Sequence, residues 1–296
     1  MTGRASSVQA GVAVANASDR LRYAAAMSGV PGSMRPLAVV GTAGWTIPRA
    51  AAAAFVGDGS HLQRYARVLT GVEINSSFYR RHAAAVYARW ASSTPPHFRF
   101  SVKLPRAITH DAALGRPRLA LVAFLQDVTA LGDKLGPLLV QLPPSQAFDP
   151  RVARRFFDTL RACHDGAIVC EPRHPSWFDV QATALLVRVR VSRAAADPSS
   201  IVAAAQPGGW TGEPADGASR PVIYHRLHGS PRMYWSRYPP ERIDRWAAEI
   251  ADLPAGGDVW CMFDNTATGS AIENALEMQQ ALSARRPITP PGRSSP

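Results

Sequence analysis

The sequence has little lysine, little cysteine and no long apolar run. Lys103 and Lys134 are its two lysines among 33 Lys and Arg residues, so arginine supplies almost all the positive charge. The three cysteines, Cys163, Cys170 and Cys261, are odd in number and lack metal-ligand spacing. This argues against a disulfide scaffold or a structural zinc site and suits a reducing cytoplasm. No stretch approaches the roughly 18 consecutive apolar residues of a membrane span, so we expect no membrane partner.

The positive charge is unevenly distributed along the 296 residues. The formal net charge is +11 and the sequence pI is about 10.4, which permits binding to nucleic acid. Residues 1–36 and 285–296 each carry a net +3, which leaves +5 for residues 37–284. The charge therefore favours a small anionic ligand in a pocket, and nucleic acid remains the alternative partner.

The two ends of the chain differ in composition from the middle. Residues 1–36 are rich in Ala, Ser and Gly and lack periodicity, so we expect a disordered extension. A transit peptide is an alternative, as is a start at Met34. Residues 285–296 contain four prolines and predict a disordered tail. The remaining 37–284 are expected to form one domain, whose oligomeric state the sequence does not indicate.

Residues 37–284 alternate between strand-like apolar runs and helix-like stretches. The expected strands are Leu37–Thr42, Val72–Asn75, Phe98–Lys103, Leu138–Leu142, Ala167–Glu171, Val187–Val191, Val222–Leu227 and Val259–Phe263. The expected helices are 60–69, 82–92, 119–132, 150–163, 180–186, 240–252 and 268–283. Continuous apolar strands predict a parallel sheet buried on both faces. Eight such units over about 250 residues favour an α/β TIM (β/α)8 barrel. A doubly wound sheet is the rival, but the first strand is followed by GTAGW rather than a Gly-rich phosphate turn.

Nearly every expected strand ends in a charged or amide residue. In a barrel these ends meet at one face, so we expect their side chains to converge in one polar site over an apolar floor. The candidate substrate-binding residues are Asn75, Tyr79, Gln141, Arg173, Trp177, Asp197, Arg226, His228, Asp264 and Asn265. The candidate catalytic residues are Glu73, Glu171, His174 and Lys103.

The same positions carry a set of motifs in a fixed order. They are GTAGW, EINSSFY, KLPRAITH, LGPLLVQLPP, EPRHPSW, YHRLHG and FDNT. In this order they resemble the YecE-like family (domain of unknown function 72), over essentially all of 37–284. The resemblance implies a TIM-barrel fold and brings no settled activity. The last motif has Asp264 where an asparagine pair or an Asn-Asp variant is expected.

The two strand-end glutamates suggest acid–base chemistry. Glu73 and Glu171 would form the pair of carboxyl groups that a glycosidase-type hydrolase requires. Alternatively each is held in a salt bridge, for instance Glu171 with Arg173 or Arg226, and orients the site without reacting.

The cationic residues at the strand ends suit an anionic ligand. Arg173, Arg226, His174 and Lys103 would hold a phosphate or carboxylate. Lys103 would otherwise be structural, or a Schiff-base nucleophile if its pKa is depressed. The amides of Asn75, Gln141 and Asn265 would orient the ligand, and aromatic residues such as Tyr79 and Trp177 would stack on it.

No metal-binding motif is present. HxH and HExxH spacings do not occur in the sequence, so we expect no metal or other cofactor, with a divalent ion as the less favoured alternative. The sequence therefore predicts a cytoplasmic enzyme with hydrolase-type acid–base chemistry on a small or nucleotide-like anionic substrate. The alternatives are a nucleic-acid-binding or repair-associated protein that uses a basic barrel face, and a ligand sensor without turnover.

Overall fold

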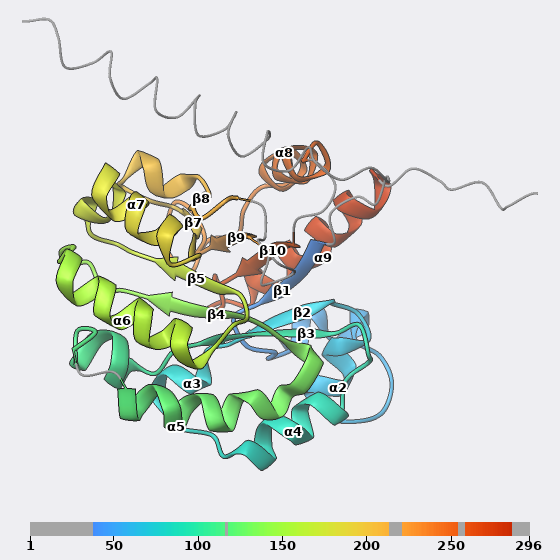
Figure 1. Cartoon of the computed structure of the whole chain (residues 1–296). Helices are drawn as coiled ribbons and strands as arrows, with labels where there is room; N and C mark the ends of the chain where they lie inside the picture. The colour runs from blue at the N-terminus through green and yellow to red at the C-terminus, as the bar shows by residue number, and fades with distance from the viewer. Residues whose placement is uncertain (1–37, 116–117, 213–220, 254–257, 286–296) are drawn as a thin grey trace, which may run out of the picture.

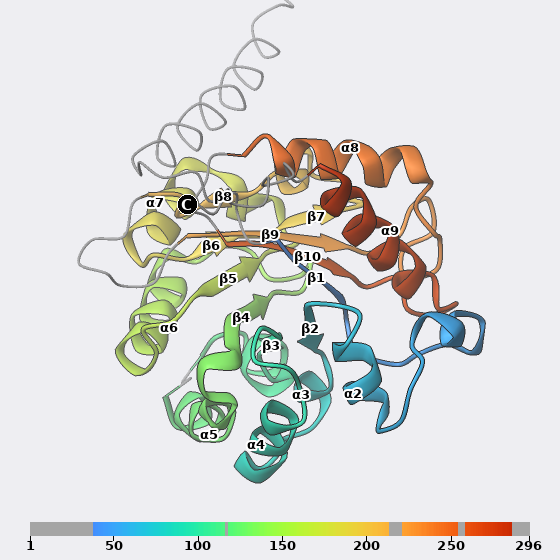
Figure 2. The same cartoon turned by 90° about the vertical axis from the view of Figure 1, so that its right-hand side faces the viewer.

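The computed structural model describes residues 38–115, 118–212, 221–253 and 258–285. The predicted extension at 1–36 lies outside the described residues, as does the predicted tail at 285–296 apart from Arg285. Strands occupy the centre of the molecule and helices surround them (Figures 1 and 2). This arrangement is an α/β fold.

The described residues form ten strands, of which seven correspond to apolar runs expected from the sequence and three short ones do not. The ten strands are β1 (Ala38–Thr42), β2 (Gly71–Ile74), β3 (Arg99–Lys103), β4 (Leu135–Gln141), β5 (Ile168–Glu171), β6 (Ser192–Arg193), β7 (Ala195–Asp197), β8 (Gly208–Gly209), β9 (Val222–Leu227) and β10 (Asp258–Phe263). Most of these residues are buried, as expected for strands that are covered on both faces.

The helices follow the strands in alternation. The α-helices are α2 (His61–Ala66), α3 (Ser76–Tyr79), α4 (Ala84–Ser92), α5 (Arg118–Val128), α6 (Pro150–Cys163), α7 (Val180–Arg188), α8 (Pro240–Ala251) and α9 (Ser270–Ala284). Shorter turns of 3-10 or π type are η1 (Arg49–Ala54), η2 (Ala107–Asp111), η3 (Thr129–Lys134), η4 (Pro175–Phe178) and η5 (Val202–Ala205). The helices expected from the sequence are confirmed.

Helix α6 shows why the helix predictions succeed. The Asp149 side chain accepts hydrogen bonds from the backbone N–H groups of Arg151 and Val152, and Pro150 occupies the first turn. A carboxylate cap satisfies free N–H groups, and proline costs no hydrogen bond at this position. The helix buries an apolar stripe that includes Phe156 and Phe157 against the sheet, so that local signals and tertiary packing agree.

The expected strand at Val187–Val191 is wrong. Helix α7 continues to Arg188, and strand pairing starts only at Ser192, the first residue of β6. The alternation of valine and arginine from 187 to 191 is typical of a strand, but Val187 is 45% exposed on the helix. Arg190 has a positive φ of 54° and ends the turn after the helix. Leu186 is buried on one side of α7. Because this packing keeps the residues up to Arg188 helical, the strand-like alternation of valine and arginine does not decide the structure.

The strands form two mainly parallel sheets. One has the order β1-β10-β9-β7, and the other has the order β2-β3-β4-β5-β6-β8, in which β8 is antiparallel to β6. The two sheets meet where β1 lies beside β2: Ala43 pairs with Glu73, and the Gly44 N–H donates to the Glu73 carbonyl at 2.9 Å. A Cβ at Gly41 would lie 1.9 Å from the Gly71 carbonyl oxygen, so only glycine permits this approach.

The core has an inner and an outer part. The larger part lies among the strands and the helices that cover them. The smaller part consists of buried side chains from strands of both sheets and from Ala194 between β6 and β7, namely Val39, Leu139, Val169, Ala194, Val222, Tyr224, Trp260 and Met262. The rings of Tyr224 and Trp260 stack there with centroids 6.0 Å apart. This inner cluster forms the apolar floor beneath the polar strand ends.

None of the helices formed by the described residues combines the length and the apolar character that crossing a bilayer requires.

Candidate active site

The Arg226 guanidinium lies at the centre of a buried cluster of charged side chains. Its Nε and Nη2 donate to the two carboxylate oxygens of Glu73, at 2.9 and 2.6 Å. Its Nη1 donates to Glu171 Oε2 at 2.6 Å, and its Nη2 also donates to Asp264 Oδ2 at 3.2 Å. Arg226 and Glu171 are each 1% exposed and Glu73 is fully buried. One planar fork thus joins three carboxylates, the geometry for which arginine is suited.

The alternation of side chains along β9 explains why Arg226 lies on the same side of the strand as its neighbours in the cluster. Residues two apart on a strand share a face, so Tyr224, Arg226 and His228 follow one another along the same side. The Tyr224 hydroxyl lies 2.9 Å from Glu73 Oε2 and 2.8 Å from Ser101 Oγ. Tyr224 and Ser101 were not among the candidate residues. The position of Tyr224 two residues before Arg226 is the signal that could have identified it.

The pKa values of two carboxyl groups respond to their cationic neighbours. Burial alone would raise the pKa of Glu171, but the charges of Arg226 and Arg173 outweigh it and hold this pKa well below its usual range. Burial also opposes ionisation of Asp264, whose pKa is nevertheless lowered by the charge of Arg226 and by the hydrogen bond with His228. Both carboxylates are therefore ionised at neutral pH.

His228 and Arg173 connect the cluster to its surroundings. The His228 Nδ1 lies 3.0 Å from Asp264 Oδ2, and its Nε2 lies 3.3 Å from Glu171 Oε1. Arg173 Nε donates to Glu171 Oε1 at 3.0 Å, while Nη1 donates to the Tyr234 hydroxyl at 3.0 Å. The Arg173 side chain is 20% exposed, whereas those of Glu171 and His228 are 1% exposed. Arg173 is the member of the cluster that reaches toward solvent.

Lys103, the last residue of β3, lies beside the cluster without joining its hydrogen bonds. Its Nζ is 4.1 Å from the centroid of the Phe78 ring, and the residue is 7% exposed. Among the described residues, no hydrogen bond or salt bridge holds this Nζ. Burial and the nearby charge of Arg226 lower the pKa of Lys103 to about 8, and the charges of Glu73, Glu171 and Asp264 partly oppose this shift.

The formal charges of these residues balance. Three carboxylates, on Glu73, Glu171 and Asp264, face three cationic side chains, Arg173, Arg226 and Lys103. Because the charges cancel, the cluster presents no large excess of positive charge to a polyanion.

Three amide side chains lie at or just beyond strand ends. Gln141 ends β4, is 8% exposed and pairs in register with Glu171 of the adjacent strand. Asn265 Nδ2 donates to the Ser236 carbonyl and to Asn274 Oδ1. The Oδ1 atoms of Asn75 and Asn265 are buried and have no hydrogen-bond partner among the described residues. A buried acceptor without a partner costs free energy, which a bound hydrogen-bond donor would recover.

Four candidate residues stay apart from the Arg226 cluster in their contacts. Tyr79 is 79% exposed on α3. Asp197 forms a salt bridge with Arg242, the second residue after Pro240 in α8. His174 Nδ1 lies 2.9 Å from Ser176 Oγ and accepts from the Ser176 N–H at the start of η4. Trp177 is buried, and its Nε1 donates to the Gln146 carbonyl at 3.0 Å. The roles predicted for these four stay predictions.

Among the described residues, no group of three or more His, Cys, Asp or Glu side chains is arranged to hold a metal ion. Of the three cysteines, Cys163 is exposed and the other two are buried. Cys170 and Cys261 are fully buried, and burial raises the pKa of both thiols, to about 12 for Cys261. They pack as small core residues.

The fold and the cluster together define a class: an α/β protein with a polar candidate site at the carboxyl ends of parallel strands. The family model described as "Protein of unknown function DUF72" matches residues 39–295. The chain therefore belongs to this family, as its motifs indicated.

Two curated relatives carry names of the same kind. The chain is 33% identical over 120 residues to the UPF0759 protein YecE of Escherichia coli K12, covering 40% of this chain and 43% of that protein. It is 25% identical over 251 residues to the UPF0759 protein YunF of Bacillus subtilis 168, covering 75% of this chain and 86% of that protein. The chain thus spans less than half of the YecE protein in that match.

Solved structures of DUF72 family proteins share the fold. The protein from Thermotoga maritima MSB8 superposes with a TM-score of 0.67 at 22% identity, over 83% of this chain and 99% of that chain. A protein from Enterococcus faecalis V583 superposes with a TM-score of 0.64 at 20% identity, over 83% of this chain and 96% of that chain. At these identities the likeness establishes the fold and leaves the activity open.

Proposed function

We propose that this protein is an enzyme that uses acid–base chemistry of hydrolase type on a small or nucleotide-like anionic substrate. The substrate binds at the edge where the parallel strands end. The observation that carries the proposal is the state of Lys103: a buried amine beside a network of ion pairs that does not include it. A network that served stability alone would gain little from such a group, because burial lowers the pKa of the amine even though the Phe78 ring and three nearby carboxylates offset part of the cost of its charge.

Lys103 has the properties of a proton-transfer group. A pKa of about 8 leaves both the amine and the ammonium form available near neutral pH, which is the condition for efficient acid–base catalysis. Its lack of a hydrogen-bond partner among the described residues leaves the Nζ donors and lone pair available to a substrate. Glu73 and Glu171 are both bound to Arg226, so we assign them to orienting the site and fixing its charge.

Arg173 is the proposed anion-binding residue. Its Nε is bound to Glu171 and its Nη1 to Tyr234, which leaves Nη2, 3.3 Å from His228 Nε2, as the arm nearest to being free. A guanidinium that is held by a carboxylate and whose side chain is 20% exposed can bind a phosphate or carboxylate. The unpartnered Oδ1 atoms of Asn75 and Asn265 would accept hydrogen bonds from substrate hydroxyl groups.

We also propose that the two sheets form one closed TIM barrel. The Ala43–Glu73 pair supports a seam between β1 and β2. On the other side, β6 pairs with β5 while β7, two residues later in the chain, pairs with β9. One extended segment, 192–197, thus contacts both sheets. Closure would bring all strand ends to one face, where TIM-barrel enzymes carry their sites.

A binding and turnover screen tests the function. The purified full chain is screened by thermal shift against phosphorylated and carboxylated metabolites, since a ligand at 100 times its Kd adds about 2.7 kcal/mol of stability. We expect anions to raise the melting temperature and Arg173→Gln to weaken this effect at least tenfold in affinity. Arg154→Gln, on the exposed side of α6, is the matched control and should bind like the wild type.

Compounds that bind are then tested for turnover. In the wild type, kcat/KM should change with an apparent pKa near the Lys103 value of about 8, and Lys103→Met should lose turnover together with that pH dependence. Anion binding with no turnover of any bound compound would instead favour a ligand sensor. Salt-sensitive binding of DNA or RNA, with no response to small anions, would favour a nucleic-acid-binding protein.

A further inference from the structure

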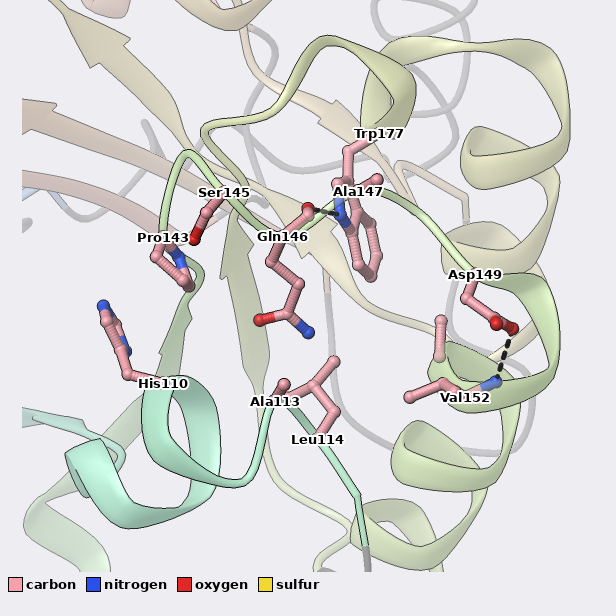
Figure 3. A pocket seen from close by; sticks show the side chains of 11 residues that line it. His110, Ala113, Leu114, Pro143, Ser145, Gln146, Ala147, Asp149, Val152 and Trp177 are labelled. Carbon is pink, nitrogen blue, oxygen red and sulfur yellow. Dashed lines mark hydrogen bonds between the residues drawn. The ribbon is translucent and has the colours of Figure 1, made fainter.

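A cavity lies among the segments that follow the carboxyl ends of β3, β4 and β5. Its volume is about 300 Å³, at the lower end of the roughly 300–1,000 Å³ usual for small-molecule sites. It is lined by the segments that follow three strands, and these contribute His110 after β3, Gln146 after β4 and Trp177 after β5. Figure 3 shows the Gln146 side chain projecting between His110 and Trp177.

The wall of the cavity is apolar and locally strained. Ala113, Leu114, Val152 and Trp177 line it. Ala113 and Leu114 have positive φ values of 43° and 66°, a conformation that costs non-glycine residues free energy and persists only when the surroundings impose it. The Trp177 ring is fixed by packing edge-on against Phe148 and by its hydrogen bond to the Gln146 carbonyl. The cavity is therefore largely preformed.

Two polar side chains of the cavity, Gln146 and His110, keep hydrogen-bonding atoms without a partner in the part of the chain that the structure describes, whereas Asp149 caps α6. Gln146 Oε1 is buried and has no hydrogen-bond partner among the described residues. The described residues also form no hydrogen bond with the Gln146 amide nitrogen or with His110 Nε2. The other ring nitrogen, His110 Nδ1, lies 2.9 Å from Thr109 Oγ1. A buried carbonyl oxygen without a partner costs roughly 1–3 kcal/mol. A side-chain amide offers an acceptor and a donor next to each other.

The cavity also adjoins the cationic residues. The His110 ring packs edge-on against Phe78 at 4.9 Å, and Phe78 in turn carries Lys103 Nζ over its face. Burial lowers the pKa of His110, and the positive charges of Lys103, Arg106 and Arg173 lower it further, against the charge of Asp111. The ring is therefore neutral at pH 7 and can donate or accept a hydrogen bond according to its tautomer.

We infer that this cavity binds the flat ring of the substrate, a neutral heterocycle with adjacent N–H and C=O groups such as a nucleobase. The Gln146 amide pairs with these two groups, and Trp177 and Leu114 contact the faces or edges of the ring. This inference rests on the proposed function for the anionic part of the molecule, which extends toward Lys103 and Arg173. The ring itself can be tested alone.

The test compares matched ring compounds on the purified full chain by isothermal titration calorimetry. Uracil and hypoxanthine each present adjacent N–H and C=O groups, while 1,3-dimethyluracil keeps the carbonyl groups and lacks both N–H donors. We expect uracil or hypoxanthine to bind and dimethyluracil to bind at least tenfold more weakly, because Gln146 Oε1 then stays unpartnered. Equal affinity for uracil and 1,3-dimethyluracil overturns the inference, as does the absence of binding for both uracil and hypoxanthine.

A variant pair gives an independent measurement. Gln146→Met keeps the length of the side chain and removes both hydrogen-bonding groups, so base affinity should fall at least tenfold. Gln126→Met is the matched control, since Gln126 is exposed on α5 outside the cavity, and it should bind like the wild type. Unchanged affinity in Gln146→Met overturns the inference, and the dimethyluracil comparison still decides if this variant does not fold.

The two proposals fail separately. Anion binding that depends on Arg173, with no base binding at all, overturns the ring assignment and leaves the proposed function standing. Base binding that depends on Gln146, with no response to phosphorylated or carboxylated compounds, supports the ring assignment and overturns the anionic substrate class.

Discussion

Arg226 donates two parallel hydrogen bonds to Glu73, from Nε to Oε2 at 2.9 Å and from Nη2 to Oε1 at 2.6 Å. Arg226 lies on β9 and Glu73 on β2, which belong to different sheets. Both side chains are almost completely buried. The pair joins β9 to β2 near the carboxyl ends of the strands. It orients Glu73 and leaves Arg226 Nη1 for Glu171, so one cationic residue sets the positions of the acidic residues around it.

Removal of this guanidinium should be strongly destabilising. Arg226→Met would leave Glu73 and Glu171 buried without their main cationic partner, and breaking a buried ion pair from one side costs about 3–5 kcal/mol. We expect the free energy of unfolding to fall by at least about 3 kcal/mol in urea denaturation. Arg154→Met, which removes an exposed i,i+4 partner of Asp158, is the control and should leave stability almost unchanged. A loss below about 1 kcal/mol in Arg226→Met would contradict the importance of the pair.

The lowered pKa values of Glu171 and Asp264 predict loss of stability in acid. A carboxyl group with a lower pKa in the folded state stabilises the fold above its unfolded pKa, near 4, and this contribution is lost as pH falls through the folded pKa. The free energy of unfolding, measured by urea denaturation at a series of pH values, should therefore decrease below about pH 5. Asp264→Asn should give a shallower slope. Asp158→Asn, on the exposed side of α6, should keep the wild-type slope; equal slopes in all three proteins would refute the prediction.

The sequence predicted most elements because their signals are local. Apolar runs mark the buried strands, and Asp149 with Pro150 marks the start of α6. The strand expected at Val187–Val191 failed because its alternation of valine and arginine also fits the last turn of α7. Only packing of the helix against its neighbours decides between the two patterns.

The convergence of the charged residues was predictable, and their pairing was not. Parallel strands bring their carboxyl ends to one edge, so Glu73, Glu171 and Arg226 were expected to meet. Which carboxylate each guanidinium nitrogen binds depends on strand register and rotamers, which the sequence does not reveal. The cavity around Gln146 was not predicted, because the loop at Ala113 and Leu114 adopts positive φ values that non-glycine residues rarely signal.

The approach of β1 to β2 predicts that Gly41 cannot be replaced. Gly41→Ala would place a Cβ 1.9 Å from the Gly71 carbonyl oxygen, and relieving such a clash in a packed sheet costs roughly 1–3 kcal/mol. We expect a lower melting temperature by scanning calorimetry. Gly212→Ala is the control, since its Cβ would meet Trp210 Nε1 at an ordinary 3.4 Å. Equal melting temperatures for the two variants would show that the strands can separate without cost.

The two lysines should respond in opposite directions to the same substitution. Lys134 Nζ donates to the carbonyl groups of Ala91 and Thr94, both at 2.5 Å, so Lys134→Met removes two hydrogen bonds and should lower stability. Lys103 Nζ has no hydrogen-bond partner among the described residues, and its pKa is lowered from 10.5 to about 8. When the pKa of a lysine is lower in the folded than in the unfolded state, its protonation lowers the free energy of unfolding. For Lys103 this loss of stability is complete below pH 8 and disappears as the pH rises toward the unfolded pKa.

Lys103→Met should therefore stabilise the protein at pH 6–7, by about 3 kcal/mol at most, since a pKa unit corresponds to about 1.4 kcal/mol. The gain should shrink steadily between pH 8 and 10.5, the folded and unfolded pKa values of the lysine. Urea denaturation of the wild type and both variants at pH 6.5, 8.5 and 10 measures this trend. A destabilised Lys103→Met at pH 6.5 would mean that the amine is held by the cluster and contributes to folding. A stabilised variant that has lost turnover would show that the fold tolerates a costly buried charge because the reaction needs it.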